Sequence, residues 1–347
     1  MRRASTSGAR PAAAYVSWVP YFGRSQSFVD ALGLCPIYVH HLRERQLWLL
    51  PIRYPTQFIV TILRLVQRRP KVVFVMDPPA FAAVAVHLYC RLAGGRYIMD
   101  CHSGVFEKPR WKWLLPLQAF YGRRAEGVLV TNTAHEVAVQ GWGARPLVVG
   151  DPPLNIPPPS GSTLNHKLGG DFVFVINTFG RDEAVSALLD AARRLPHIKF
   201  YVSGNLKWAR PEYVQNAPPN ITFTGFLSIR DFWSYARLAR AIVVLTVQEN
   251  TILRGGWEAM YLGQPLVTSA TKALKSYFTA GTVFVENTGE GIASGVEEAL
   301  KRAEELSTGM RRFREEKYRV WKEDRRRLET LLDFQFDTPE VPQPAAT

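Results

Sequence analysis

Two glutamates and two glycines lie close together in the second half of the chain. Glu249 and Glu258 can accept hydrogen bonds from hydroxyl groups. Gly255 and Gly256 have no Cβ, so a ligand can approach their backbone closely. They precede an expected helix that ends at Gly263, and the N–H groups at a helix N-terminus attract anions. The pattern predicts a site for an anionic ligand that also bears hydroxyl groups, and a sugar diphosphate meets both conditions.

The elements around this stretch must hold it in place. The apolar run 241–245 is typical of a buried strand, and Pro265 can open a second strand because its missing N–H costs little there. Strand, polar loop, helix and strand in this order form one unit of a parallel α/β sheet. The alternative is an ordinary unit of this kind with a solvated, glutamate-rich loop.

Residues 258–267 resemble the donor-site signature of the family 4 retaining glycosyltransferases. The signature expects an earlier glutamate at the position of Asn250, whereas Glu249 lies one residue before it. Either the loop has one extra residue and Glu249 fills the role, or Asn250 has taken it. The resemblance implies an α/β chain of the GT-B fold, with two Rossmann-like domains facing a cleft and a C-terminal helix that crosses back to the N-terminal domain.

Length and composition set broad limits. The 347 residues suffice for two domains, and a hydrophobic fraction of 47% indicates an ordered globular protein. The three cysteines, Cys35, Cys90 and Cys101, form neither a disulfide framework nor a metal-ligand spacing, which favours a reducing compartment. We find no signal peptide and no apolar run long enough to span a membrane, and we therefore expect a cytoplasmic protein.

The formal net charge of +13 calls for an anionic partner, which a nucleic acid, a membrane surface or a substrate can supply. No nucleic-acid-binding module is present, so we expect no nucleic-acid partner. Tryptophans and cations alternate in residues 109–117, and Trp48, Leu49, Leu50 and Arg53 have a similar character, which is typical of surfaces that face lipid headgroups. We expect peripheral attachment to the inner face of a membrane. The alternative is that these aromatic residues pack under helices.

The sequence divides into six segments. We expect helices over 28–32 and 56–69 in the first domain, and prolines make the connection between the domains semi-rigid. The segments are a disordered tail (1–12), an N-terminal, acceptor-side domain (13–150), a proline-rich linker (151–170), a C-terminal domain for the nucleotide-sugar donor (171–308), a crossover helix (309–332) and a tail (333–347).

The N-terminal domain offers two loops for the site. The loop after the first strand contains Gly23, Arg24 and Ser25, which are candidates for contacts with the acceptor or the donor phosphates, or else form a plain turn with a helix cap. A later strand ends at residue 100, and the resemblance implies that His102, which follows it, contacts the donor sugar. Gly104 would allow close backbone approach. The alternative for His102 is a solvated loop.

In the donor domain the resemblance implies a set of residues at successive strand ends. The family commonly has a lysine five residues after the arginine of the first loop, but position 186 is Ser186, so Lys207 or Arg254 would supply the missing charge. A Thr-Gly-Phe-Leu segment lies where the family holds the nucleobase. The donor-binding candidates are Gly180, Arg181, Gly204, Asn205, Lys207, Gly225, Phe226, Leu227, Asn250, Arg254, Gly255 and Gly256.

The resemblance implies transfer of a hexose-type sugar from a nucleotide-sugar to an acceptor hydroxyl with retention of configuration. We assign His102, Glu249 and Glu258 to the catalytic site, with Glu249 or Asn250 on the donor sugar and Glu258 on the ribose. We expect no metal, because no Asp-x-Asp motif stands at a strand end, and no cofactor, because the nucleotide-sugar is a co-substrate. The acceptor would be a sugar or a lipid-linked molecule in polysaccharide or glycolipid assembly. The alternatives are a nucleotide-sugar epimerase or hydrolase on the same fold, and a degenerate, non-catalytic binding protein.

Overall fold

The computed structural model describes residues 12–19, 23–40, 47–158 and 171–337. Most of the expected N-terminal tail, the second part of the linker and the last ten residues lie outside this range. The described residues form two compact units. The N-terminal unit comprises those of Met1–Pro153 and Trp321–Gln343, and the C-terminal unit comprises those of Leu154–Val320.

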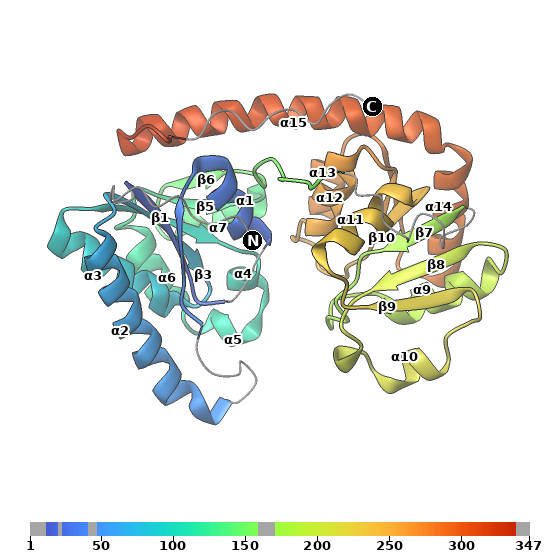
Figure 1. The fold of residues 1–347 in the computed structure, drawn as a ribbon, viewed down its shortest axis with the longest axis horizontal. Coiled ribbons are helices and arrows are strands. Elements are labelled where there is room, and N and C mark those ends of the chain that lie inside the picture. Colours follow the sequence, from blue (N-terminus) through green and yellow to red (C-terminus); the bar gives the residue numbers. More distant parts are fainter. Residues whose placement is uncertain (1–11, 20–22, 41–46, 159–170, 338–347) are drawn as a thin grey trace. The chain divides into compact units, whose positions relative to one another are not determined.

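The N-terminal unit contains a six-stranded parallel sheet in the order β2-β1-β3-β4-β5-β6 (Figure 1). The central strands β1 and β3 are buried along their whole length, which explains their continuous apolar runs. The strands are β1 (Ala13–Ser17), β2 (Cys35–Tyr38), β3 (Val72–Asp77), β4 (Arg96–Cys101), β5 (Gly127–Val130) and β6 (Pro146–Val148). The helical elements are α1 (Gly23–Leu32), η1 (Leu47–Leu49), α2 (Leu50–Arg68), α3 (Ala80–Ala93), α4 (Gly104–Glu107), α5 (Pro109–Lys112), α6 (Leu115–Gly122) and α7 (Thr133–Gly141).

The C-terminal unit contains a second six-stranded parallel sheet, in the order β12-β11-β10-β7-β8-β9. Strands β7, β10 and β11 are buried throughout. The strands are β7 (Phe172–Val175), β8 (Lys199–Ser203), β9 (Ile221–Gly225), β10 (Ala241–Val244), β11 (Leu266–Ser269) and β12 (Thr282–Val285). The helical elements are α9 (Val185–Arg194), η2 (Leu206–Trp208), α10 (Pro211–Gln215), α11 (Ile229–Leu238), α12 (Arg254–Leu262), α13 (Lys272–Tyr277) and α14 (Gly289–Lys301).

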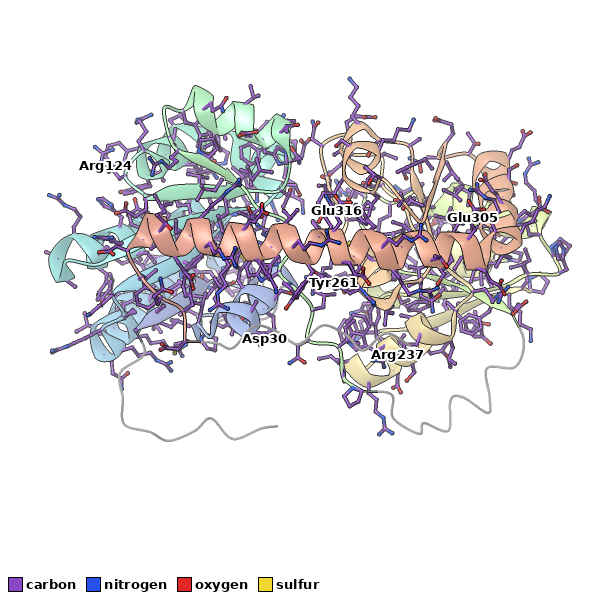
Figure 2. All side chains as sticks on the ribbon, turned by 90° about the horizontal axis from the view of Figure 1, so that it is seen from above. Asp30, Arg124, Arg237, Tyr261, Glu305 and Glu316 are labelled. Atoms are coloured by element: carbon purple, nitrogen blue, oxygen red, sulfur yellow. The ribbon has the colours of Figure 1, made fainter. Side chains whose placement is uncertain are left out.

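The last helix, α15 (Ala303–Leu332), contributes to the cores of both units. Met310 and Phe313 are buried in the C-terminal unit, whereas Trp321, Leu328 and Leu332 are buried in the N-terminal unit. Figure 2 shows α15 as one continuous helix with charged side chains along its exposed surface, Glu305 and Glu316 among them.

The two parallel sheets confirm the expected α/β class with two Rossmann-like units, but several helix boundaries differ from the prediction. Helix α15 begins at Ala303 rather than at residue 309, because Gly309 lies within it, where a Cβ would approach the backbone of Gly281 to 3.2 Å. Helix α2 begins at Leu50 rather than at residue 56, since Pro51 lies in the first turn, where proline costs no hydrogen bond. Helix α1 begins at Gly23 rather than at residue 28.

The expected linker and C-terminal tail are partly packed against the two units. Residues 151–154 at the start of the linker are buried, and the contact boundary between the units lies between Pro153 and Leu154. In the expected tail, Phe336 is buried in the N-terminal core, with its ring centroid 6.1 Å from that of Phe74.

Candidate functional site

The predicted donor residues all lie at the carboxyl edge of the C-terminal sheet. In a parallel sheet every strand points the same way, so the loops that follow the strands share one edge, which is where ligands of such sheets bind. Gly180 and Arg181 follow β7; Gly204, Asn205 and Lys207 follow β8; Gly225, Phe226 and Leu227 end or follow β9; and Glu249, Asn250, Arg254, Gly255, Gly256 and Glu258 follow β10.

The N-terminus of α12 is suited to an anion. The helix begins at Arg254, and its N-cap residue, Leu253, is in an extended conformation and makes no side-chain cap hydrogen bond. The first N–H groups of a helix lack partners inside the helix, and the helix dipole gives them a positive potential. A phosphate group placed at this end would therefore receive both hydrogen bonds and favourable electrostatics.

Arg254 and Glu258 form an ion pair one helical turn apart. Arg254 Nε lies 3.4 Å from Glu258 Oε1, and the two side chains are 28% and 14% exposed. The pair brings a cation and a carboxylate together in the first two turns of α12. The sequence offers Arg254, beside Arg181 and Lys207, as a candidate for the diphosphate and assigns Glu258 to the ribose. The structure adds a direct contact between Arg254 and Glu258.

The structure gives a different reason for the two glycines from the one we predicted. Both lie inside the first turn of α12 rather than in the loop before it, and both are buried. A Cβ on Gly255 would lie 2.8 Å from Val244 Cγ2, and a Cβ on Gly256 would lie 2.5 Å from Phe278 Cζ. The missing Cβ atoms therefore allow α12 to pack closely on the core.

We expect Gly256→Ala to lower the free energy of unfolding of the C-terminal unit by about 1–3 kcal/mol, because the buried ring of Phe278 must move to admit a methyl group. Gly141→Ala at the end of α7 is the control, since its Cβ would meet nothing within 4 Å and alanine favours helix. Urea unfolding of both variants provides the measurement. Equal stabilities would contradict the packing role of Gly256.

Glu249 caps another helix in this structure. Its Oε2 accepts a hydrogen bond from the Lys272 N–H at 3.1 Å, and its backbone oxygen accepts one from the Ala273 N–H at 3.1 Å. The side chain is exposed, whereas its neighbour Asn250 is partly buried in the same loop. Glu249 thus fixes the β10–α12 loop to the N-terminus of α13, and the sugar-binding role assigned to Glu249 or Asn250 stays a prediction.

A carboxylate that we did not predict organises the loop after β7. Glu183 accepts hydrogen bonds from the N–H groups of Thr178 (2.9 Å) and Gly180 (2.8 Å). Burial raises the pKa of Glu183, although these hydrogen bonds act in the opposite direction. The amide of Gly180 is therefore already bonded, and the side chain of Arg181 is exposed beside it. The sequence signal for this role is the position of Glu183, three residues after Gly180 and just before helix α9.

Two further glycines shape the β8 and β9 ends of the edge. Gly204 has φ +129°, and a Cβ there would lie 2.7 Å from the oxygen of Asn177, so the turn requires glycine. Gly225 also has a positive φ and precedes Phe226, whose side chain is 86% exposed. Lys207 is exposed, and its N–H donates to Asn205 Oδ1 at 3.1 Å.

A polar network that the sequence did not reveal holds the ends of β10, β11 and β12 together. Ser269 Oγ accepts a hydrogen bond from the Thr246 N–H at 2.9 Å and donates one to Asn287 Oδ1 at 2.7 Å. Asn287 Nδ2 donates to the oxygen of Thr246 at 2.9 Å, which closes the ring. These contacts fix the strand ends from which the β10 loop departs.

In the N-terminal unit, His102 belongs to a buried network centred on Asp100. Asp100 accepts hydrogen bonds from Tyr15 Oη (2.6 Å) and Arg24 Nε (2.9 Å), and its Oδ2 lies 3.1 Å from His102 Nε2. Burial alone would raise the pKa of Asp100, but the positive charge of Arg24, followed by the interaction with His102, holds it well below its usual range. The carboxylate therefore orients the ring of His102, which is only 7% exposed.

Arg24 and Ser25 make their contacts inside the N-terminal unit. Arg24 Nη1 lies 2.9 Å from Asp151 Oδ1 and Nη2 donates to the oxygen of Val149 at 3.0 Å, in addition to the contact with Asp100. Ser25 is fully buried and donates to the Tyr15 hydroxyl at 3.1 Å. Both residues thus support the network around His102, and their contact with an acceptor or a donor phosphate stays a prediction.

The remaining candidates of this unit lie close by. Gly23 is the first residue of α1, and Gly104 is the first residue of α4. A Cβ on Gly104 would make only ordinary contacts, at 3.6 Å from Lys108 and 3.8 Å from Pro78, so packing does not demand glycine there.

A second buried carboxylate, Asp77, ends β3 in this unit. Its side chain is fully buried, and Oδ1 has no hydrogen-bond partner among the described residues. The thiol of Cys101 lies 3.8 Å from Oδ2. Burial raises the pKa of Asp77 to about 7.

The residues assigned to a membrane surface differ in exposure. The side chains of Trp48 and Trp113 are 73% and 69% exposed, whereas Leu114 is buried. No helix in the described ranges is both long enough and apolar enough to cross a bilayer. Within these ranges there is also no group of three or more His, Cys, Asp or Glu side chains placed to hold a metal ion.

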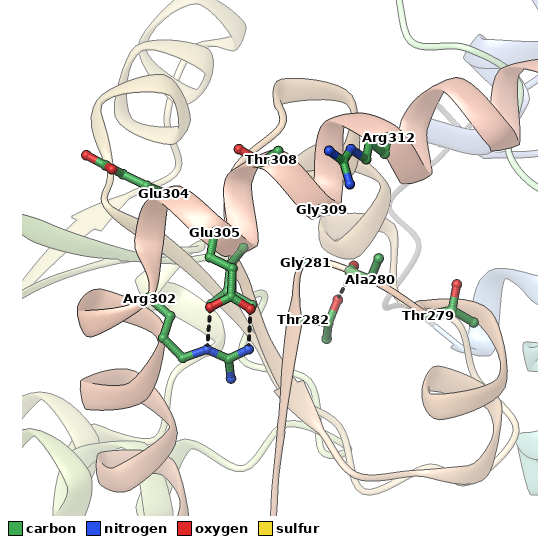
Figure 3. Close-up of a pocket in the computed structure, with 11 residues that line it drawn as sticks. Thr279, Ala280, Gly281, Thr282, Arg302, Glu304, Glu305, Thr308, Gly309 and Arg312 are labelled. Atoms are coloured by element: carbon green, nitrogen blue, oxygen red, sulfur yellow. Dashed lines mark hydrogen bonds and ion pairs between the residues drawn. The ribbon is translucent and has the colours of Figure 1, made fainter.

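Two hollows of the C-terminal unit lie at the amino edge of its sheet, opposite the carboxyl edge that holds the predicted donor residues. One of about 630 Å³ is lined by Gly281 and Thr282 at the amino end of β12 and by Arg302 and Glu305, which form an ion pair (Figure 3). Another of about 480 Å³ lies beside Pro265, before β11, and is lined by Arg237, Arg240 and Arg311. Neither includes a predicted donor residue.

Comparison with known proteins supports the fold and the family resemblance. Residues 181–333 match a family model described as "Glycosyl transferase-like". No curated protein matches the chain in sequence. The matched segment contains the β10–α12 loop and most of the predicted donor residues, and it excludes the N-terminal unit.

Several solved structures share the whole architecture. Anabaena HepE, solved with UDP-glucose, has a TM-score of 0.71 at 12% identity, over 92% of this chain and 99% of that one. Sucrose-phosphate synthase from Thermosynechococcus elongatus has a TM-score of 0.66 at 14% identity, over 86% and 83%. A Listeria monocytogenes protein described as a UDP-N-acetylglucosamine 2-epimerase has a TM-score of 0.63 at 11% identity, over 95% and 100%. At these identities the likeness establishes the fold, GT-B, as expected.

Proposed function

We propose that this chain, whose residues 181–333 match the glycosyl transferase-like family and whose two units have the GT-B fold, transfers a sugar from a nucleotide-sugar to an acceptor hydroxyl. The observation that supports this most directly is the α12 N-terminus. It places an uncapped helix end, the guanidinium of Arg254 and the carboxylate of Glu258 at the carboxyl edge where sheets of this kind bind nucleotides.

Each group has a task in the proposed reaction. As the bond between the sugar and the diphosphate breaks, negative charge grows on the leaving diphosphate, and Arg254 with the N–H groups of α12 stabilises it. Glu258 binds the ribose and orients Arg254. Glu249 or Asn250 binds hydroxyls of the donor sugar. His102, held by Asp100, is the group that we propose contacts the sugar from the N-terminal unit.

The finer features of the reaction rest on the resemblance in the sequence. We propose a hexosyl transfer with retention of configuration and without a metal ion. The acceptor that we propose is lipid-linked, as in polysaccharide or glycolipid assembly, and the enzyme would meet it at the inner face of a membrane. UDP is the first nucleotide to test, because HepE was solved with UDP-glucose.

Arg254→Ala is expected to weaken binding of the nucleoside diphosphate by about 10- to 100-fold, since a charge-assisted contact with the phosphates is lost. Thermal-shift titrations of the purified protein with UDP, GDP, ADP and dTDP, with and without Mg²⁺, measure this and identify the base. Arg240→Ala is the matched control, because Arg240 immediately precedes the same strand, β10, at its amino end.

The turnover experiment separates transfer from the rival activities. With a nucleotide-sugar and an added acceptor, transfer gives a glycosylated product, whereas a hydrolase releases free sugar and an epimerase changes the nucleotide-sugar when no acceptor is present. Binding without any of these products would favour the degenerate binding protein. Nucleotide affinity that is the same in wild type and Arg254→Ala would place the diphosphate elsewhere.

A further inference from the structure

Helix α2 buries polar side chains and exposes apolar ones. Its buried side chains are those of Gln57, Thr61 and Leu65. In a helix that only covers a sheet, the apolar stripe faces the sheet. On α2 a second apolar face points to solvent. It consists of Ile52 (59% exposed), Ile59 (57%), Leu63 (62%) and Val66 (51%). These residues follow one another at spacings of seven, four and three, which places them on one side of the helix.

Each of the two buried polar residues of α2 makes a hydrogen bond to the sheet side of the unit, which explains its inward position. Gln57 Nε2 donates to the oxygen of Val39 at 2.9 Å, and Thr61 Oγ1 accepts from Trp18 Nε1 at 2.9 Å. These contacts fix the rotation of α2 about its own axis. The exposed apolar face is therefore a consequence of how the helix is held to the sheet.

Helix α3 extends the apolar face. It packs beside α2 in the N-terminal unit (Figure 1) and exposes Leu88 (42%) and Leu92 (81%). A hollow of about 430 Å³ lies between the two helices and is lined by Val66, Leu88 and Leu92 among others. The hollow places Val66 of α2 beside Leu88 and Leu92 of α3, so the exposed apolar residues of the two helices form one group rather than scattered single residues.

The charged side chains that α2 and α3 themselves contribute are all positive. Helices α2 and α3 contain no aspartate or glutamate, whereas they contain Arg53, Arg64, Arg68 and Arg91. Arg64 donates to the backbone oxygen of Tyr38, so this contact leaves its charge uncompensated. Arg69 and Lys71 line the hollow and add two more cations.

We propose that the face formed by Ile59, Leu63, Val66, Leu88 and Leu92 docks on the surface of an anionic membrane. The apolar side chains would enter the boundary between headgroups and acyl chains, and the arginines would meet lipid phosphates, as in amphipathic helices that lie in the membrane plane. Trp48, 73% exposed at the start of the same stripe, suits the headgroup level.

The charges favour a membrane over a second copy of the chain. In a symmetric dimer the same patch meets itself, so the arginines around the two apolar faces would be brought together without carboxylates from α2 or α3 to pair with them. An anionic bilayer supplies the opposite charge along the whole face. The surface includes Trp48 and Arg53 but not the 109–117 segment, although both stretches stand out in the sequence. The inference rests on the membrane attachment in the proposed function and deepens it by naming the surface.

Co-sedimentation with lipid vesicles tests the proposal without nucleotide-sugar. We expect wild type to bind vesicles of phosphatidylcholine mixed with phosphatidylglycerol, to bind pure phosphatidylcholine far less, and to lose affinity as salt is raised. The double variant Leu63→Glu, Leu92→Glu places two carboxylates in the face and is expected to lower the partition coefficient at least about 10-fold. Arg64→Gln with Arg91→Gln is expected to weaken binding to the anionic vesicles selectively.

Val214→Glu is the matched control, because Val214 is a 44% exposed apolar residue on α10 of the C-terminal unit. It should bind vesicles like wild type. Each variant should also show the far-UV circular dichroism and the cooperative urea unfolding of wild type, which shows that the N-terminal unit is folded. Unchanged vesicle binding by Leu63→Glu, Leu92→Glu would overturn the proposal. A wild-type dimer that this variant converts to monomer, without vesicle binding by either, would assign the face to a second copy instead. Failure of either kind would leave the donor site untouched.

Discussion

Arg24→Met is expected to lower the free energy of unfolding of the N-terminal unit by roughly 3–5 kcal/mol. The guanidinium lies between Asp100 and Asp151, with an N–O distance of 2.9 Å to each, and all three side chains are at most 5% exposed. Removing the guanidinium takes its positive charge from between two buried carboxylates that water does not reach. The loss comes from that missing charge, because methionine replaces most of the volume of the arginine.

Hydrogen exchange localises the effect. Amides of β4, next to Asp100, should exchange faster in the variant, whereas amides of β10 in the other unit should be unchanged. Arg240→Met is the matched control, since Arg240 pairs with Asp171 at 3.6 Å and the two side chains are 45% and 77% exposed; such a pair contributes at most about 1 kcal/mol. An equal loss in both variants would contradict the role of burial.

The network around Asp100 also makes the stability of the protein depend on pH. The pKa of Asp100 is lower in the folded state than in the unfolded chain, so its contribution to stability is present above the unfolded pKa and is lost as the pH falls through the folded value. Arg24→Met should remove most of this dependence, because the charge of Arg24 is the main interaction that lowers the pKa of Asp100.

Asp77→Asn is expected to raise the free energy of unfolding at pH 8. The contribution of Asp77 to stability changes with pH in the opposite direction to that of Asp100. Burial raises the pKa of Asp77 from 3.8 to about 7, so the folded state holds a proton that the unfolded chain releases. The contribution of Asp77 is present below about pH 4 and is lost as the pH rises through 7, by up to roughly 4 kcal/mol at 1.36 kcal/mol per pKa unit. Asparagine has nearly the same shape and carries no charge at any of these pH values.

Urea unfolding of wild type and Asp77→Asn from pH 5 to pH 8 measures the difference. The free energy of unfolding of the variant, relative to that of wild type, should increase steadily between these limits and change little above pH 8. Asp190→Asn serves as the control, because the side chain of Asp190 is 46% exposed and its partner Arg194, at 3.2 Å, is 51% exposed. A stability difference that is constant with pH would show that Asp77 ionises normally.

The sheets were predictable from the sequence because their signal is local. Runs such as Val72–Asp77 and Ala241–Val244 are continuous and β-branched, and each became a strand buried on both faces. Helix boundaries were less predictable, since proline and glycine often, but not always, mark the end of a helix. Pro51 falls in the first turn of α2, where it is harmless, and Gly309 lies inside α15 because another segment packs against it.

The positions of the donor residues were predictable, but their present partners were not. Strand order alone brings the β7, β8, β9 and β10 loops to one edge. The partners depend on side-chain packing between segments distant in sequence: Phe278 determines why Gly256 is glycine, and α13 determines where Glu249 points. Arg24 illustrates the limit, because a loop arginine suits a phosphate as well as it suits Asp151, which lies 127 residues further along.

Helix α15 bears on the order in which the protein is made. A ribosome releases the strands of the N-terminal unit first, and domains usually begin to fold as they emerge. Yet Trp321, whose ring centroid lies 5.9 Å from that of Phe28, together with Leu328 and Leu332, completes the core of that unit. The first sheet to be synthesised must therefore wait, with part of its apolar surface uncovered, until almost the entire chain has been translated, and a nascent chain stalled before Trp321 should be a preferred target of chaperones.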